Sequence, residues 1–311
     1  MSVAYLFPGQ GAQSPGFLHR LPQHPAVTHT LEEASGVLGS DVRMLDTAAA
    51  LRSTANVQLS VLIAGVAVAR ALSQEGIQVA AVAGLSVGAF GAAVACGALG
   101  FVEALALVRT RGECMEHAYP AGYGMAAIVG LDERGVAAVL ERVGGADAQI
   151  YIANINAPTQ IVISGADLAL EAAMRVARER GARQAERMAV STPSHSPLLH
   201  AVSEHLAAAM RTIEFHTPRC PYVSNRRARA VRDSTGVRDD LIANVANIVR
   251  WHDSVTVLYE LGARLFIEPP PGGVLTRLAQ QAFPMARAIA AEGVQIRSIV
   301  QAVSHAVESW A

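Results

Sequence analysis

The chain has 311 residues, with 25 Lys and Arg against 26 Asp and Glu, and a formal net charge of −1. This length suits one large domain with a smaller one inserted or appended, and the near-neutral charge argues against a nucleic-acid binder, which needs a basic surface. Hydrophobic residues make up 51% of the chain and aromatic residues only 5%, so we expect an aliphatic, alanine-rich core.

The spacing of the cysteines and the sequence of the first residues indicate the cellular compartment in which the protein acts. Cys96, Cys114 and Cys220 are widely spaced and form neither a metal-ligand nor a disulfide pattern. The first segment has no basic region and is interrupted at Pro8, so it does not resemble a signal peptide. We therefore expect a cytoplasmic protein with no bound metal.

The 27 residues from Gly76 to Val102 carry no charge. By hydropathy alone they are a candidate membrane span. The stretch contains six glycines and has no basic flank, which is typical of a buried segment instead. Both explanations are open at this point, and we expect the buried centre of a soluble fold.

The first part of the chain predicts alternating strands and helices. Ser53 and Thr54 are plausible N-caps for a long apolar helix. In chain order we expect a strand over 3–7, helices over 31–38 and 57–72, a strand over 79–83, and helices over 90–99 and 101–115.

From about Met125 the pattern changes to β-α-β-β-α-β, which is the ferredoxin-like order. The expected elements are strands over 125–131, 150–155, 160–164 and 187–190, with helices over 133–143 and 168–180. This block looks like an insert, because helix and strand alternation resumes after His195. There we expect a helix over 198–210, a strand over 221–224, a helix over 239–249, a strand over 264–267 and a helix from about 273.

The segment Gly84-Leu85-Ser86-Val87-Gly88 matches the G-x-S-x-G nucleophile elbow. It follows a predicted strand and precedes a predicted helix, which is the context that the motif requires. A sharp turn there would expose the Ser86 hydroxyl, and the helix N-terminus would favour an oxyanion. The alternative, a tight turn in a glycine-rich segment, is weaker because of this context.

A serine nucleophile needs a base, and the chain has ten histidines. We favour His195 as this base because it lies where the chain should return to the main domain. No Asp stands out as its orienting partner. The glycine-rich loop after the first strand lacks the Lys of a P-loop, so it is either a simple turn or a loop that aims the Gln10 amide at a reaction centre.

Six segments together resemble the malonyl-CoA:acyl-carrier-protein transacylases. They are FPGQGAQ (7–13), GLSVGAF (84–90), RGECM (111–115), NINAPTQIVISG (154–165), STPSHSPLL (191–199) and NIVRWHDSV (247–255). The resemblance implies an α/β fold with an α/β-hydrolase-like large domain over 1–124 and 198–311 and an inserted ferredoxin-like small domain over 125–197. It also implies an acyltransferase that uses malonyl-CoA as substrate, the phosphopantetheine-type thiol of an acyl carrier protein as acceptor, and no permanently bound cofactor.

The resemblance also assigns roles. Ser86 would be the acylated nucleophile and His195 its base, oriented by a backbone carbonyl near Arg250. The Val87 N–H and Gln10 would form the oxyanion hole. Arg111 would pair with the malonyl carboxylate, a role that suits a planar guanidinium. Asn156 and Arg250 would also line the substrate site.

Three positions depart from the usual family pattern: Leu85 replaces a His, Ala89 replaces a Glu and Arg250 replaces a Gln. Together with the runs VRWHD (249–253) and EPPPGG (268–273), they are more similar to the transacylase (epsilon) subunit of bacterial malonate decarboxylase. We therefore expect that subunit, acting with the decarboxylase carrier subunit. The alternative is the transacylase of fatty-acid or polyketide synthesis, and more distant ones are a serine esterase or thioesterase and a non-catalytic carrier-binding subunit.

Arg226, Arg227, Arg229 and Arg232 form the densest basic cluster in the sequence. Such a cluster would meet an acidic carrier or CoA phosphates. The interleaved alanines and a nearby aspartate slightly favour a solvated turn.

Overall fold

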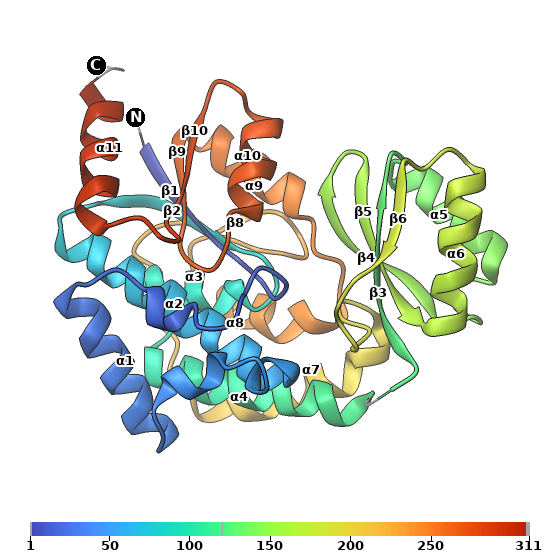
Figure 1. The fold of residues 1–311 in the computed structure, drawn as a ribbon, viewed down its shortest axis with the longest axis horizontal. Coiled ribbons are helices and arrows are strands. Elements are labelled where there is room, and N and C mark those ends of the chain that lie inside the picture. Colours follow the sequence, from blue (N-terminus) through green and yellow to red (C-terminus); the bar gives the residue numbers. More distant parts are fainter. Residues whose placement is uncertain (1, 120, 309–311) are drawn as a thin grey trace.

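The computed structural model describes residues 2–119 and 121–308, which form a large unit and a small unit packed side by side (Figure 1). The large unit is built on a six-stranded sheet and the small unit on a four-stranded sheet. This architecture confirms the predicted α/β class with a ferredoxin-like insert.

The strand order of the large sheet is β10-β9-β1-β2-β7-β8, and every pair is parallel except β7 with β8. Its strands are apolar because helices cover both faces. The parallel arrangement places the carboxyl ends of β1, β2 and β7 at one edge, which is where ligands bind in such sheets. The strands are β1 (Ser2–Phe7), β2 (Val79–Gly84), β7 (Tyr222–Val223), β8 (Ala230–Val231), β9 (Ala263–Glu268) and β10 (Arg287–Ala290).

Alternate residues of β1 point to opposite faces, as a strand requires. Tyr5 and Phe7 belong to the larger core, with α1, α2, α3, α4, α7, α8 and α11, whereas Ala4 and Leu6 belong to the core under α9 and α10. These helices are α1 (Pro25–Leu38), α2 (Thr54–Gln74), α3 (Gly88–Ala95), α4 (Phe101–Ala118), α7 (His200–Ala209), α8 (Ser234–Ala243), α9 (Trp251–Glu260), α10 (Val274–Ala282) and α11 (Ile296–Glu308).

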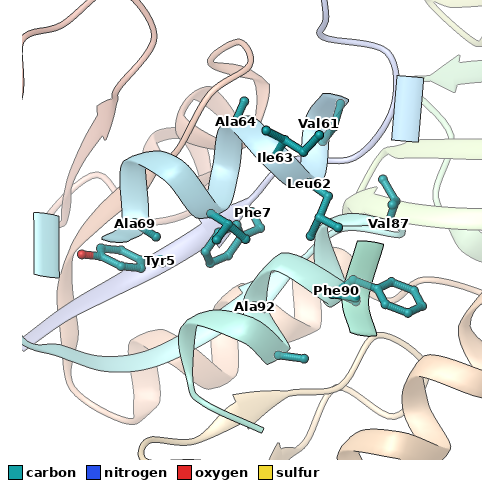
Figure 2. Packing of buried hydrophobic residues seen from close by; sticks show 14 of the residues in the cluster. Tyr5, Phe7, Val61, Leu62, Ile63, Ala64, Ala69, Val87, Phe90 and Ala92 are labelled. Atoms are coloured by element: carbon teal, nitrogen blue, oxygen red, sulfur yellow. The ribbon is translucent and has the colours of Figure 1, made fainter. Parts of the chain in front are cut away.

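Phe7 shows why small residues are needed around β1. A Cβ atom at Gly65 of α2 would lie 3.1 Å from the Phe7 ring, and one at Gly91 of α3 would lie 2.7 Å from it. Figure 2 shows the Phe7 ring between the two helices, with Leu62 and Phe90 nearby. The glycines therefore let α2 and α3 pack closely against the sheet on which the site is built.

The helix α2 is long and apolar enough to cross a membrane by length and composition, and 89% of its most apolar window is buried inside the protein. Ser53 caps it, because its hydroxyl accepts a hydrogen bond from the Asn56 N–H at 3.2 Å. The uncharged stretch Gly76–Val102 is a different segment. It divides into β2, a tight turn, α3 and the start of α4, so it is not a single spanning helix.

The small unit has the antiparallel order β4-β5-β3-β6, with α5 and α6 on the side away from the large unit (Figure 1). Its first strand begins at Tyr123, two residues before the predicted boundary, and the predicted division at 125 and 197 otherwise stays a prediction. Its elements are β3 (Tyr123–Val129), α5 (Glu133–Val143), β4 (Ile150–Ala157), β5 (Gln160–Ala166), α6 (Asp167–Glu179) and β6 (Gln184–Arg187).

Several predicted elements are displaced. The strand expected over 187–190 lies earlier, as β6 over Gln184–Arg187, and Met188 and Val190 after it line a pocket. The helix expected over 239–249 begins at Ser234, where Asp233 caps it. The helices α9 and α11 and the strands β8 and β10 were not predicted. The two strands are so short that their apolar residues cannot show a period of two.

Candidate active site

Ser86 lies on a sharp turn between β2 and α3, in the left-handed region at φ +56°. The turn brings backbone segments so close that a Cβ atom at Gly84 would lie 2.0 Å from the Gly88 carbonyl oxygen. A Cβ atom at Gly88 would lie 2.3 Å from the Phe7 carbonyl oxygen. Both glycines of the motif are therefore required by packing, and the unusual conformation of Ser86 is held by its surroundings.

Asn225, directly after β7, holds this turn from the side. Its Oδ1 accepts a hydrogen bond from the Ser86 N–H at 3.0 Å, and its Nδ2 donates to the Gly84 carbonyl oxygen at 2.7 Å. The Asn225 N–H donates to Asp240 Oδ2 at 3.1 Å, and Asn225 is buried. Our sequence analysis missed Asn225, although its position at the end of a predicted strand was a usable signal.

His195 and Ser86 face each other, with Nε2 2.7 Å from the Ser86 Oγ. The other ring nitrogen, Nδ1, lies 2.9 Å from the Asn244 carbonyl oxygen, which only accepts. Nδ1 therefore carries the proton, and Nε2 accepts the serine hydroxyl hydrogen. The accepting carbonyl was expected near Arg250 and is instead that of Asn244, which ends α8. The Asn244 side chain also donates to the Ser86 carbonyl oxygen at 3.3 Å.

The environment of His195 keeps its ring neutral. Burial, and then the positive charge of Arg111, lower the pKa of His195 from 6.5 to about 4. The side chain is only 3% exposed. At neutral pH the imidazole is therefore available as a proton acceptor.

Arg111 of α4 lies in the same site. One of its terminal nitrogens donates to the Gln58 Oε1 at 2.6 Å and the other to the Ser86 Oγ at 3.2 Å. It is 1% exposed, and burial lowers its pKa to about 9, so it remains charged at neutral pH. Within the described part of the chain no carboxylate lies within 4.0 Å of this guanidinium. A buried cation without a counter-ion is costly, and an anionic substrate group would compensate it.

The pocket beside Ser86 has a volume of about 70 Å³. Gln10, on the loop after β1, and Val87 both line it. The Val87 N–H donates no hydrogen bond within the described residues. The loop that carries Gln10 lies close against the Ser86 turn, since a Cβ atom at Gly9 would be 2.8 Å from the Leu85 carbonyl oxygen. Val87 and Gln10 are thus the candidate donors for an oxyanion.

The structure brings five predicted residues together with Ser86, and Arg250 is not among them. Gln10, Val87, Arg111, Asn156 and His195 share the pocket, and the buried Asn156 Oδ1 has no hydrogen-bond partner within the described residues. Arg250 instead pairs with Glu133 at 3.2 Å and Asp253 at 3.5 Å, because its side chain turns toward α5 of the small unit. The prediction that Arg250 lines the substrate site is therefore not supported.

The remaining lining residues were missed by our sequence analysis. Most are apolar side chains that show no local pattern of a site, and Gln58 is a polar residue on an otherwise apolar helix face, which is a weak signal. They are Gln58, Leu85, Met115, Met125, Asn154, Val162, Met188, Val190 and Ser194.

Comparison with known proteins agrees with this geometry. Residues 4–301 match the family described as the acyl transferase domain. The malonyl CoA-acyl carrier protein transacylase of Salmonella typhimurium is 36% identical in an alignment of 285 positions that covers 89% of this chain and 92% of that protein. The protein of the same name from Bacillus subtilis is 36% identical in an alignment of 284 positions that covers 90% of each chain.

Solved structures give the same result. The acyl-carrier-protein S-malonyltransferase of Burkholderia pseudomallei superposes with a TM-score of 0.92 at 36% identity, covering 98% of this chain and 100% of that one. A malonyl-transacylase in complex with its type II PKS acyl-carrier protein has a TM-score of 0.92 at 33% identity, with coverages of 98% and 100%.

Proposed function

Since the chain belongs to the acyl transferase domain family, we propose that it moves a malonyl group from malonyl-CoA to the thiol of an acyl carrier protein. The relatives described above carry that activity in their names. The observation that carries the proposal is the arrangement around the Ser86 Oγ. The His195 imidazole and the buried Arg111 guanidinium, which has no counter-ion among the described residues, both lie within hydrogen-bond distance of this atom.

The first half-reaction follows from these contacts. His195 Nε2 takes the proton of Ser86 as its Oγ attacks the thioester carbonyl. The tetrahedral intermediate collapses, the carbon–sulfur bond breaks, and CoA leaves as the thiol with the proton that His195 returns. The malonyl group is now esterified to Ser86, with its free carboxylate beside Arg111.

The second half-reaction repeats these steps in reverse. His195 takes the proton of the carrier thiol, the thiolate attacks the malonyl ester, and Ser86 leaves with the proton. In both halves the oxyanion would be held by the Val87 N–H and a group of Gln10, and losing one such donor typically lowers a rate by about 10²- to 10³-fold. Water must react poorly with the ester, or the protein would act only as a thioesterase.

The test is to trap the intermediate. Malonyl-CoA labelled in the acyl group should label the peptide that contains Ser86, as read by mass spectrometry of an acid-quenched digest. Adding a carrier protein that bears its thiol arm should then discharge the label onto the carrier. Label on another residue, or release as free malonate at the same rate with and without carrier, would contradict the proposal.

The pH dependence of acylation provides a second prediction. Because His195 must be neutral and its pKa is lowered from 6.5 to about 4, kcat/KM for malonyl-CoA should stay level down to about pH 5 and fall by half near pH 4. In Arg111→Ala the inflection should rise toward 6.5, because the second cause of the lowered pKa is removed. Stopped assays across this range measure both, and an inflection near 6.5 in the unaltered protein would contradict the argument.

A second candidate is the transacylase subunit of malonate decarboxylase. Two residues favour it, Leu85 in the pocket lining and the fully buried Ala89, which stand where most transacylases of the family were expected to carry His and Glu. The curated relatives described above support the first candidate more directly. Comparing the fatty-acid carrier with a decarboxylase carrier subunit as acceptor distinguishes the two, since the physiological carrier should have the higher kcat/KM.

A further inference from the structure

Four arginines line one groove on the large unit. They lie on the loop that joins β7 to β8 and just after it, and together with the first turns of α8 they surround a volume of about 460 Å³. We call it the arginine groove, and its basic residues are Arg226, Arg227, Arg229 and Arg232.

These four guanidinium groups have no carboxylate within 4.0 Å among the described residues, although many arginines elsewhere do. The acidic residues of the groove are engaged with other groups. Asp233 accepts from the Gly236 N–H at 2.7 Å, and Asp239 pairs with Arg238 at 3.5 Å. Asp240 is buried and accepts the Tyr222 hydroxyl at 2.7 Å. Because Asp233 and Asp240 keep their charge when they accept from neutral donors, they offset part of the arginine charge, and the groove retains a net positive charge with none of its four arginines in a direct ion pair in the described part of the chain.

The loop that carries the arginines is ordered by its own backbone. The Ser224 N–H donates to the Arg229 carbonyl oxygen at 3.0 Å, and the Ala228 N–H donates to the Ser224 carbonyl oxygen at 3.1 Å. The Arg229 N–H also donates to the Ser224 Oγ at 3.3 Å. Such bonds are usual in a hairpin connection, and the order that they give the loop reduces the entropy lost when a ligand binds.

The groove is also tied to the active site. Arg226 follows Asn225, whose side chain holds the Ser86 turn, and the N–H groups of both residues point to Asp240. Both sites therefore lie at the carboxyl end of β7. CoA carries its phosphates at the far end of a flexible arm, and the pocket of about 70 Å³ is too small to hold them, so they lie outside the pocket when the thioester is at Ser86.

We infer that the arginine groove binds the phosphate groups at the nucleotide end of malonyl-CoA. This inference rests on the proposed function. Guanidinium groups form paired hydrogen bonds with phosphate oxygens, and four arginines without a direct ion pair among the described residues offer several such donors in one groove. The volume is within the range of small-molecule sites. The carrier arm has a phosphate of its own, so the experiments below separate the two sources.

Binding is measured first, without any chemistry. Adenosine 3′,5′-bisphosphate, which carries the 3′-phosphate of CoA and the first phosphate of its 5′-diphosphate, is titrated by calorimetry into the protein and into the double variant Arg227→Ala with Arg229→Ala. We expect the variant to bind at least about tenfold more weakly. The matched control is Arg134→Ala with Arg175→Ala, which removes two exposed arginines from α5 and α6 and should bind normally. No binding to the unaltered protein, or equal binding to all three, would overturn the inference.

Kinetics then identify the source of the phosphate. The Arg227/Arg229 variant should raise the KM for malonyl-CoA about tenfold and leave the KM for malonyl-pantetheine, which lacks the nucleotide, unchanged. A raised KM for the carrier alone would assign the groove to the carrier and overturn the inference. Acylation of Ser86 by malonyl-pantetheine tests the proposed function without the groove, so the two can fail separately.

Discussion

Ser86→Ala and His195→Ala should each lower malonyl transfer by about 10⁴-fold or more, and the double variant should lose no more than the worse single variant. The reason is that the two side chains act as one unit, joined through the 2.7 Å contact of Nε2 with Oγ. Without His195 the hydroxyl keeps its proton, and without Ser86 the imidazole has no nucleophile to activate. Pre-steady-state acylation and steady-state transfer to the carrier measure the losses.

The matched control is His200→Ala. His200 begins α7, five residues after His195, and its side chain is 74% exposed, so this variant should keep full activity. Losses of Ser86→Ala and His195→Ala that multiply in the double variant would show two independent roles. Such a result would contradict the pair, as would a Ser86→Ala protein that still forms a malonyl ester at the normal rate.

The sharp turn at Ser86 could be predicted because its signal is local. Within five residues the sequence shows a strand end, two glycines and a serine, and the structure explains each glycine by a carbonyl oxygen within 2.3 Å of the Cβ that it lacks. The ferredoxin-like insert could be predicted for a similar reason, since strands and amphipathic helices each carry their own period. The resemblance added Arg111 and assigned roles to His195 and Gln10, which the residue pattern had already singled out, and the structure places all three in the pocket of Ser86.

The supporting residues could not be predicted, because their contacts join distant parts of the chain. Asn225 and Asn244 contact the Ser86 backbone across 139 and 158 residues. The end of a predicted strand is the one local signal for Asn225, and Asn244 has none. The carbonyl that orients His195 is a backbone atom, which leaves no trace in residue identity. The structure does not bring Arg250 into the pocket lining, because the partner of a partly exposed arginine depends on the packing of the small unit, where Glu133 lies in reach.

Arg111→Ala should change which acyl group is transferred. In the free protein the guanidinium is a buried charge whose hydrogen-bond partners among residues 2–119 and 121–308 are the neutral Gln58 and Ser86. A malonyl carboxylate would complete an ion pair there, and breaking a buried pair typically costs about 3–5 kcal/mol. We therefore expect malonyl transfer to fall by about 10²- to 10⁴-fold, whereas acetyl transfer, which offers no carboxylate, should change by less than about tenfold.

Two variants test whether geometry or charge is responsible. Arg111→Lys keeps a positive charge but loses the planar fork, so it should recover only part of the malonyl rate. Arg109→Ala removes a charge from the same helix two residues earlier, where its contact is the Leu38 carbonyl oxygen at 3.5 Å, and should leave both rates unchanged. The measurement is kcat/KM with malonyl-CoA and acetyl-CoA for each variant. Equal losses for the two acyl groups in Arg111→Ala would assign Arg111 to holding Ser86 in place, because the 3.2 Å contact with the Ser86 Oγ is used by both substrates.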